Sequence, residues 1–337
     1  MTAERGGGAP PAIAWPALVL TAGLGTRLRP LSLLCAKPAL PVAGVPLVGR
    51  ILRWLSASGV DRAVLNLHHL PASITAVVGD GTGCGLRVRY SWEPALLGSA
   101  GGPARALPLI DADRFFIVNG DTLTDVDLAA LAADHQRSGA DVTLALVPNP
   151  DPDHYGGVAV AHDGRVTGFT PRGPANTGLH FVGVQAVNAG VFAPLDRHQP
   201  AESVNGVYRQ MIAQRPGSVR AFVSASVFRD IGTAADYVDT CLDLARLERA
   251  GGRLAGHGTQ VAENASITDC VLWDDVRVEA GAILRRSVVT SGVAIPTGTR
   301  FDDAVIRRRE GGPIEPGERL VGDLLVSPVG RSRRTGS

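Results

Sequence analysis

A glycine-rich segment near the N-terminus has the residue types that bind phosphate groups. Residues 20–31 read LTAGLGTRLRPL, and Lys37-Pro38 follows soon afterwards. Glycine lets backbone N–H groups approach an anion closely, and the side chains of Arg27 and Lys37 add two positive charges. The segment directly follows an apolar run that we predict to be a strand. This combination suits a triphosphate.

Two well-known phosphate-binding patterns do not fit this segment. The dinucleotide pattern GxGxxG has Leu28 at its third glycine position, and the P-loop GxxxxGK[ST] fails because the chain contains no Gly-Lys pair. The chain has 33 basic residues, of which Lys37 is the only lysine. A lysine in so arginine-rich a chain points to a need for an ammonium group. The alternative is that it remained by chance.

The pattern GxGTRLxPL followed by KP resembles the signature of the sugar-1-phosphate nucleotidylyltransferases, a family that includes mannose-1-phosphate guanylyltransferases. Further segments resemble motifs of this family, in the family's order, over residues 15–245. They are Glu93 with Leu97-Gly98-Ser99-Ala100-Gly101, Asn119-Gly120-Asp121, Tyr155-Gly156-Gly157-Val158, Phe181-Val182-Gly183 and Asp230-Ile231-Gly232-Thr233. The resemblance implies a Rossmann-like nucleotidyltransferase domain of the α/β class.

The resemblance also implies a role for each segment. Nucleotide binding falls to Leu20, Ala22, Gly23, Gly25, Thr26, Glu93, Gly98, Ser99 and Gly101, and sugar-phosphate binding to Gly157, Arg172 and Gly183. The implied catalytic residues are Arg27, Lys37 and Asp121, and the implied ligands of Mg²⁺, the expected cofactor, are Asp121 and Asp230. Arg27 would hold the β- and γ-phosphates through its planar donor fork, and Lys37 would follow the α-phosphate. Mg²⁺ prefers carboxylate and phosphate oxygens.

In the implied reaction, an oxygen of a sugar 1-phosphate attacks the α-phosphorus of a nucleoside triphosphate and pyrophosphate leaves. Catalysis of this kind consists mainly of positioning and charge stabilisation. The sugar (mannose, a heptose or an N-acetylated sugar) and the base (guanine or uracil) stay open. Ordinary structural roles also stay open: Asp121 as a turn former, Asp230 as a helix N-cap and Glu93 as a solvated loop acid.

One motif departs from the family pattern. Where the family has Glu-Lys-Pro after a phenylalanine, this chain reads Phe169-Thr170-Pro171-Arg172. Arg172 can still bind phosphate through two donors, but Pro171 replaces the carboxylate that recognises a sugar hydroxyl. The alternative function is therefore a non-catalytic regulatory subunit that binds a nucleotide sugar. The two candidate metal ligands, together with Arg27 and Lys37, favour the enzyme.

Alternating strand-like and helix-like runs must position these residues. Short apolar runs predict strands, and apolar residues at helical spacing predict helices. Strands are expected at 17–21, 63–67, 86–92, 115–118 and 142–147, and helices at 47–58, 72–78, 128–137 and 234–250. This order predicts a mostly parallel sheet with helices on both faces, and a binding site outside the carboxyl ends of its strands.

From about His257 the chain repeats with a period of 17 residues. Cys270-Val271-Leu272 aligns with Ser287-Val288-Val289 and with Ala304-Val305-Ile306. Such regularly spaced apolar residues predict a short parallel β-helix, whose coils bury a core only by stacking. We therefore divide the chain into a catalytic domain (12–250), a hexapeptide-like β-helix (251–310) and an extension with a flexible tail (311–337). Unpaired coils at its ends suggest a homo-oligomer through the β-helix.

Composition excludes several other classes of protein. The chain has 337 residues, a net charge of +1 and 45% hydrophobic residues, which suits a globular core. Near-zero charge argues against nucleic-acid and membrane partners, and no apolar run has the length of a membrane helix. The N-terminus lacks the layout of a signal peptide, and the four cysteines form no metal or disulfide pattern. We expect a cytoplasmic enzyme of polysaccharide biosynthesis whose partners are an NTP and a sugar 1-phosphate.

Overall fold

The structure, a computed structural model, describes residues 15–248, 254–309 and 314–331. The chain divides into two compact units, each made of two stretches of sequence. Unit 1 contains residues 1–23 and 49–228, and unit 2 contains residues 24–48 and 229–337. The expected domain boundary at residue 250 and the end of the expected flexible tail (332–337) lie outside the described residues.

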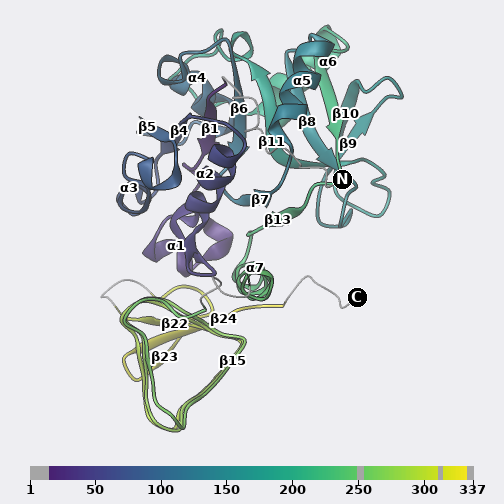
Figure 1. The fold of residues 1–337 in the computed structure, drawn as a ribbon. Coiled ribbons are helices and arrows are strands. Elements are labelled where there is room, and N and C mark those ends of the chain that lie inside the picture. The colour runs from purple at the N-terminus through teal and green to yellow at the C-terminus, as the bar shows by residue number, and fades with distance from the viewer. Residues whose placement is uncertain (1–14, 249–253, 310–313, 332–337) are drawn as a thin grey trace, which may run out of the picture. The chain divides into compact units, whose positions relative to one another are not determined.

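Unit 1 is built on a seven-stranded sheet with the strand order β12-β8-β11-β6-β1-β4-β5 (Figure 1). Its strands are β1 (Ala17–Leu20), β4 (Arg62–Leu67), β5 (Arg87–Trp92), β6 (Arg114–Asn119), β8 (Val142–Val147), β11 (His180–Asn188) and β12 (Val219–Val223). Neighbouring strands are parallel, except that β11 runs antiparallel to both β6 and β8. The prediction of a mostly parallel sheet is confirmed.

Helices cover both faces of this sheet. They are α2 (Leu47–Ala57), α3 (Pro71–Val78), α4 (Gly98–Ile110), α5 (Leu128–Ser138) and α6 (Arg209–Gln214). Phe115 and Ile117 of β6 share a hydrophobic core with α4 and α6. Phe116 points the opposite way and contacts Trp15, whose ring also meets His135 of α5. Alternating side chains of one strand therefore pack against different helices.

Helix α4, together with strands β11 and β12 and helix α6, is one of the elements of unit 1 that the sequence does not predict. Its 13 residues include Pro103, Pro108 and three glycines, a composition that disfavours a helix interior. The helix forms because its alanines lie in the core of unit 1, where Ala100, Ala104 and Ala106 are fully buried. Packing against the sheet thus overrides local propensity here.

Smaller elements complete unit 1. They are β7 (Thr122–Thr124), β9 (Gly157–Val160), β10 (Val166–Thr170), two 3-10 turns (Thr82–Cys84 and Ala189–Val191) and a π-helix (Ser203–Tyr208). Strands β9 and β10 pair as an antiparallel hairpin apart from the main sheet.

Unit 2 combines an early stretch of the chain with its C-terminal third. The early stretch holds two 3-10 turns (Thr26–Leu28 and Lys37–Ala39), α1 (Leu31–Leu34), β2 (Pro41–Val42) and β3 (Val45–Pro46). The later stretch begins near β13 (Phe228–Asp230) and continues into α7 (Ala234–Leu247). The described residues of both units contain no helix that is long and apolar enough to cross a membrane.

The β-helix of unit 2 stacks its strands in parallel, and Figure 1 views the coils along their axis as a triangle. Successive partners lie 17 residues apart, as in Gln260, Arg277 and Ala294, so the predicted repeat is confirmed. The strands are β14 (Gln260–Val261), β15 (Ser266–Thr268), β16 (Val271–Leu272), β17 (Arg277–Val278), β18 (Ile283–Arg285), β19 (Val288–Val289), β20 (Ala294–Ile295), β21 (Arg300–Asp302) and β22 (Ala304–Arg308). Strands β24 (Leu324–Pro328) and β23 (Arg319–Val321) extend one of the three sheets antiparallel to β22 and β24, respectively.

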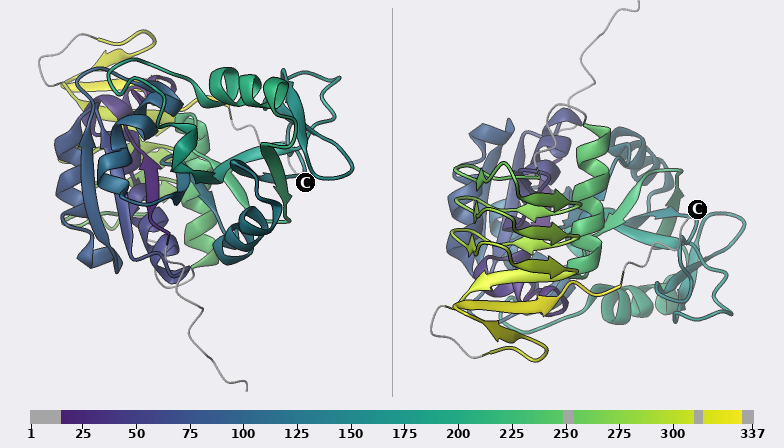
Figure 2. Two further views of the ribbon diagram at one scale, coloured as in Figure 1. Left: turned by 90° about the horizontal axis from the view of Figure 1, so that it is seen from above. Right: turned by 90° about the horizontal axis from the view of Figure 1, so that it is seen from below.

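Helix α7 runs alongside the stacked coils (Figure 2, right). Trp273 Nε1 donates to the buried Tyr237 hydroxyl at 3.0 Å, and this hydroxyl donates to the Pro41 carbonyl at 2.6 Å. An ion pair of 3.4 Å also joins Arg286 to Asp239 of α7. Through α7, the β-helix is therefore linked to the early stretch of unit 2.

Candidate active site

The carboxyl ends of β1 and β6 place the predicted metal ligand Asp121 in unit 1. The two strands are paired in register, with Leu20 opposite Asn119. Gly120 N–H donates to the Leu20 carbonyl at 2.9 Å, and a Cβ at Gly120 would collide with that same carbonyl. The glycine therefore allows the close approach that holds Asp121 beside the end of β1. This is the sheet edge at which a ligand was expected.

A buried polar network joins three strand ends in unit 1. Asn66, which is 3% exposed on β4, accepts from Thr21 N–H at 2.6 Å, and the Thr21 hydroxyl donates to the Asn66 carbonyl. The side-chain NH₂ group of Asn66 also donates to Glu93 Oε1 at 2.7 Å. The other carboxylate oxygen, Glu93 Oε2, accepts from Leu97 N–H at 2.9 Å. Glu93 is fully buried. It is therefore not a solvated loop acid, and both carboxylate oxygens hold protein groups in place.

The predicted nucleobase segment at residues 98–101 packs tightly on the segment before the π-helix. A Cβ at Gly98 would lie 2.6 Å from Glu202 Oε1, and one at Gly101 would lie 2.7 Å from the Gln199 carbonyl. Ser99 donates to Glu202 Oε2 at 2.7 Å. The glycines thus allow two backbone segments to meet. At Gly23, by contrast, a Cβ would meet nothing within 4 Å, so packing alone does not require that glycine.

The predicted sugar-binding glycines also occupy positions without room for a side chain. Gly183 has a φ of +80°, and a Cβ there would lie 2.6 Å from Asn119 Nδ2. Gly157 is confined by the side chains of Asn176 and Thr170. Gly183 therefore lies beside Asn119, the last residue of β6 and two residues before Asp121. Arg172 is exposed on the loop after β10.

Unit 2 brings together three charged residues that are far apart in the sequence. Lys37 Nζ lies 3.9 Å from Asp230 Oδ1, and the two side chains are only 10% and 13% exposed. A Cβ at Gly232 would lie 3.0 Å from Asp230 Oδ2 and 3.3 Å from Arg27 Nη1. Asp230 is therefore near Lys37 and also near Gly232, where Arg27 and Asp236, whose Oδ2 would lie 3.2 Å from the same Cβ, are close as well. This charge set suits a phosphate chain with a bound cation.

Local backbone features hold this cluster. Gly25 has a φ of +61° and its carbonyl accepts from the buried Ser32 hydroxyl at 2.8 Å, which fixes the turn that carries Thr26 and Arg27. At the other end, Thr233 is the N-cap of α7 and forms a capping box with Asp236. Asp230 is therefore not the N-cap of this helix. The alternative structural role for Asp230 is wrong.

The carboxylates of this region suit Mg²⁺ only in combination with a substrate. Among the described residues, no three His, Cys, Asp or Glu side chains form a group that could hold a metal by themselves. Mg²⁺ in phosphoryl-transfer sites usually binds one or two carboxylates together with substrate phosphates and water. Asp230, next to Lys37 in unit 2, and Asp121 in unit 1 are each a carboxylate of the kind that this mode of binding uses.

Two residues of this site were missed by the sequence analysis. Asn66 organises three strand ends, and its signal was a lone polar residue inside the apolar run at 63–67. Glu202 contacts the segment at residues 98–101, and no sequence signal marks it, because the two are brought together only by folding.

A histidine near the predicted sugar-binding segment has an altered acidity. His180 stacks against Tyr155 and Phe228, with ring centroids 4.5 and 4.3 Å away. Burial lowers the pKa of His180 to about 4, although the Gly156 backbone partly opposes this change. The imidazole is therefore neutral at physiological pH.

The fold and the site define a phosphate-handling α/β protein with a β-helix attached. Residues 16–246 match the family model described as nucleotidyl transferase, and residues 252–304 match the model described as GlmU-like, C-terminal hexapeptide. The chain belongs to the nucleotidyl transferase family.

Individual relatives agree with this assignment. The chain is 34% identical over 299 residues to mannose-1-phosphate guanylyltransferase of Mycobacterium tuberculosis, covering 86% of this chain and 79% of that protein. It is 34% identical over 220 residues to N-acetylmuramate alpha-1-phosphate uridylyltransferase of Neisseria meningitidis, covering 64% and 93%. HddC from Yersinia pseudotuberculosis, whose structure was solved with GMP-PN, superposes with a TM-score of 0.60 at 25% identity, covering 68% of this chain and 99% of that one.

Proposed function

We propose that this protein transfers a nucleotidyl group from an NTP to a sugar 1-phosphate, giving an NDP-sugar and pyrophosphate. The preferred nucleotide is GTP and the preferred sugar is mannose or a heptose. The relatives named for guanylyl transfer support this choice, and the relative named for uridylyl transfer makes UTP the first competitor. The placement of Asp230 close to Lys37 and, beside Gly232, close to Arg27 is the observation that carries the proposal.

Each half of the site is assigned a task. In unit 2, Arg27 holds the β- and γ-phosphates through its fork, and Lys37 neutralises charge at the α-phosphate and the leaving pyrophosphate. In unit 1, the backbone of residues 20–23 receives the nucleotide, and the Asn66–Glu93 pair keeps the strand ends in register. The segment at residues 98–101 lines the base pocket.

The sugar phosphate is assigned to the loop and glycines beyond Asp121. Arg172 binds its phosphate, and Gly157 and Gly183 leave room for the sugar ring. The sugar-phosphate oxygen then attacks the α-phosphorus from the side opposite the leaving group. Asp121 and Asp230 would hold Mg²⁺, which supplies positive charge to the phosphoryl oxygens when bound.

The test is pyrophosphate release from a matrix of NTPs and sugar 1-phosphates in the presence of Mg²⁺. We expect the highest kcat/KM for GTP with mannose or heptose 1-phosphate, and UTP to be the next-best nucleotide. A productive pair names both substrates at once. No release from any pair, with nucleotide binding still detected by thermal shift, would contradict the enzyme and favour a regulatory subunit, as the altered motif at Pro171-Arg172 would then indicate.

A further inference from the structure

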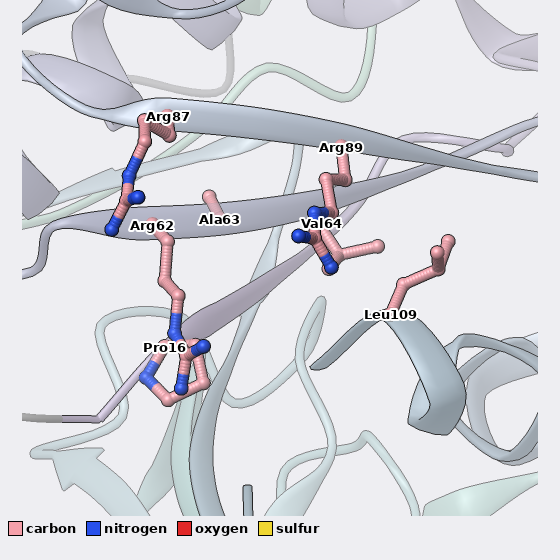
Figure 3. A pocket seen from close by; sticks show the side chains of 7 residues that line it. All are labelled: Pro16, Arg62, Ala63, Val64, Arg87, Arg89 and Leu109. Carbon is pink, nitrogen blue, oxygen red and sulfur yellow. The ribbon is translucent and has the colours of Figure 1, made fainter. Parts of the chain in front are cut away.

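A small pocket in unit 1 is lined by three arginines and lies away from the residues described above. It has a volume of about 80 Å³ and is formed by the start of β4, the start of β5, the end of α4 and Pro16. Figure 3 shows the side chains of Arg62, Arg87 and Arg89 on one side of the strand pair, with Leu109 of α4 beside them.

Strand register explains why the three arginines lie on one face of the strand pair. Arg62 of β4 is directly opposite Arg87 of β5, and Val64 is directly opposite Arg89. Residues two apart on a strand share a face, so Arg87 and Arg89 both extend over β4. Like charges directly across a strand pair destabilise it. The pocket therefore holds a repulsion that an anion would relieve.

The positive charge of the pocket is only partly balanced by protein groups. Arg87 pairs with Asp61 at 3.0 Å, and both side chains are largely exposed. Arg62 donates to the Asp111 carbonyl at 3.4 Å, a neutral partner. Within the part of the chain that the structure describes, the Arg89 side chain makes no hydrogen bond or ion pair. Three guanidinium groups thus have one carboxylate partner.

Ordinary structural roles account for single members of this group but not for the whole. Charged side chains protect an edge strand from pairing with another chain, and β5 is the edge strand of the sheet. That role covers Arg87 and Arg89 but not Arg62, which lies on the interior strand β4. A cation is favourable at a helix C-terminus. Arg62 is the one arginine of the three that could have this role, because it donates to the carbonyl of Asp111, the C-cap of α4.

The pocket is separate from the proposed active site. Arg62 and Arg87 are the first residues of β4 and β5, whereas Asn66 and Glu93 lie at or just beyond the far ends of the same strands. A six-residue strand is about 17 Å long. A ligand in this pocket would therefore not touch Thr21, Asn66 or Glu93.

We propose that this pocket is a second anion-binding site, which takes the phosphate group of a small molecule. Arginine forks match the tetrahedral oxygens of a phosphate with paired donors, and the size of the cavity suits a single phosphoryl group. The apolar wall formed by Pro16, Val64 and Leu109 would contact the uncharged part of a larger ligand. The shared chemistry is a phosphate, either as the free ion or carried on a nucleoside.

The test is equilibrium dialysis of the full-length protein against radiolabelled inorganic phosphate, comparing wild type with Arg89→Ala. Loss of one charge-assisted fork contact is expected to weaken this site about tenfold. At a phosphate concentration about three times the Kd of the wild-type site, the occupancy of this site should therefore fall from about 0.75 to about 0.25 phosphate per chain in Arg89→Ala. Arg53→Ala, which removes an exposed arginine from α2, is the matched control and should bind like wild type.

Two further measurements make the result decisive. Arg89→Lys keeps the positive charge but not the planar pair of donors, and should bind phosphate with an affinity between those of wild type and Arg89→Ala. If Arg89→Ala is unstable, Arg89→Lys is compared with wild type in its place. Competition with guanosine 5′-monophosphate separates the two sources, because displacement of the Arg89-dependent phosphate identifies a nucleotide ligand, whereas no displacement identifies the free ion. Equal phosphate binding by wild type and both Arg89 variants would overturn the proposal.

Discussion

Lys37 is the residue whose chemical type the structure explains best. It is 8% exposed, and its ammonium group lies 3.9 Å from Asp230 Oδ1. An arginine at this position is longer and planar, and would form a paired contact with Asp230 in place of a mobile point charge. We expect Lys37→Arg to lower kcat about 100-fold, which is the cost of losing one well-placed donor to a developing charge.

The comparison for this substitution is Arg53→Lys, which exchanges the same two residue types at an exposed position on α2. It should leave kcat unchanged. Steady-state kinetics of both variants, with circular dichroism as a check of folding, measures the effect. A kcat for Lys37→Arg within twofold of wild type would refute the assigned role.

His180 makes stability depend on pH in a defined direction. Burial holds its pKa at about 4, below the 6.5 of an exposed histidine, so the unfolded chain binds the proton more readily. The contribution of neutral His180 to the free energy of unfolding is therefore complete above pH 6.5 and is lost as the pH falls towards 4. Linkage predicts a loss of about 2 kcal/mol between pH 7 and pH 5 from this residue.

Urea denaturation of wild type and His180→Gln at both pH values isolates this contribution. Burial also lowers the pKa of His135, which therefore acts in the same direction, but its share is common to both proteins and cancels in the comparison. The drop in unfolding free energy should be smaller by about 2 kcal/mol in the variant. An identical drop in both proteins would show that His180 does not titrate in this way.

The sequence predicted the charged residues of the site more completely than their neighbours. Arg27, Lys37 and Asp230 stand in motifs of fixed spacing, and folding brings them together in unit 2. Glu93 was also singled out, but its burial could not be read from a single position. Glu202 carries no signal, because its contact with Ser99 depends on a packing of distant segments.

At the scale of elements, the Asn66–Glu93 pair couples β1, β4, β5 and the start of α4. Both Glu93 oxygens accept hydrogen bonds from the protein, so the amide of Glu93→Gln would turn an N–H group towards one of these donors. We expect a loss of about 2 kcal/mol in unfolding free energy and a higher KM for the NTP, because Thr21 is held through Asn66.

Glu202→Gln is the matched control for this change. Glu202 also accepts a hydrogen bond next to the base segment, from Ser99, but it is exposed. Its amide variant should lose less than about 0.5 kcal/mol. Urea denaturation and NTP-dependent kinetics of both variants measure these effects. Equal losses of unfolding free energy in Glu93→Gln and Glu202→Gln would contradict the argument that the burial of Glu93 makes its substitution costly.

Elements differed in how far the sequence predicts them, for physical reasons. The strands of the sheet are short apolar runs, and the β-helix repeats itself with the 17-residue step seen in its register. Helix α4 was missed because glycine and proline conceal it. Strand β11 and its antiparallel direction were also not predicted, and even a recognised apolar run carries no mark of its direction in the sheet.

At the scale of the whole molecule, the β-helix shares a unit with the residues that carry Arg27 and Lys37. Unit 2 contains residues 24–48 as well as the coils, and Tyr237 links them through Trp273 and Pro41. Sequence composition places boundaries along the chain, but it cannot show that a segment near the N-terminus folds with one near the C-terminus. The relative from Neisseria meningitidis matches 64% of this chain over 93% of its own length, so it is a shorter protein than this one.

Truncation after Glu248 tests whether the part of unit 2 that carries Arg27 and Lys37 depends on the β-helix. All the proposed catalytic and metal-binding residues remain, but the buried Tyr237 hydroxyl loses Trp273 and the residue gains solvent exposure. We expect kcat/KM to fall about 100-fold, because small displacements of positioning groups are costly in phosphoryl transfer. Tyr237→Phe in the full chain removes only the hydroxyl, and should lower the unfolding free energy by about 2 kcal/mol. Full activity of the truncated chain would show that residues 24–48 fold correctly without the coils, and would leave the β-helix a role in assembly.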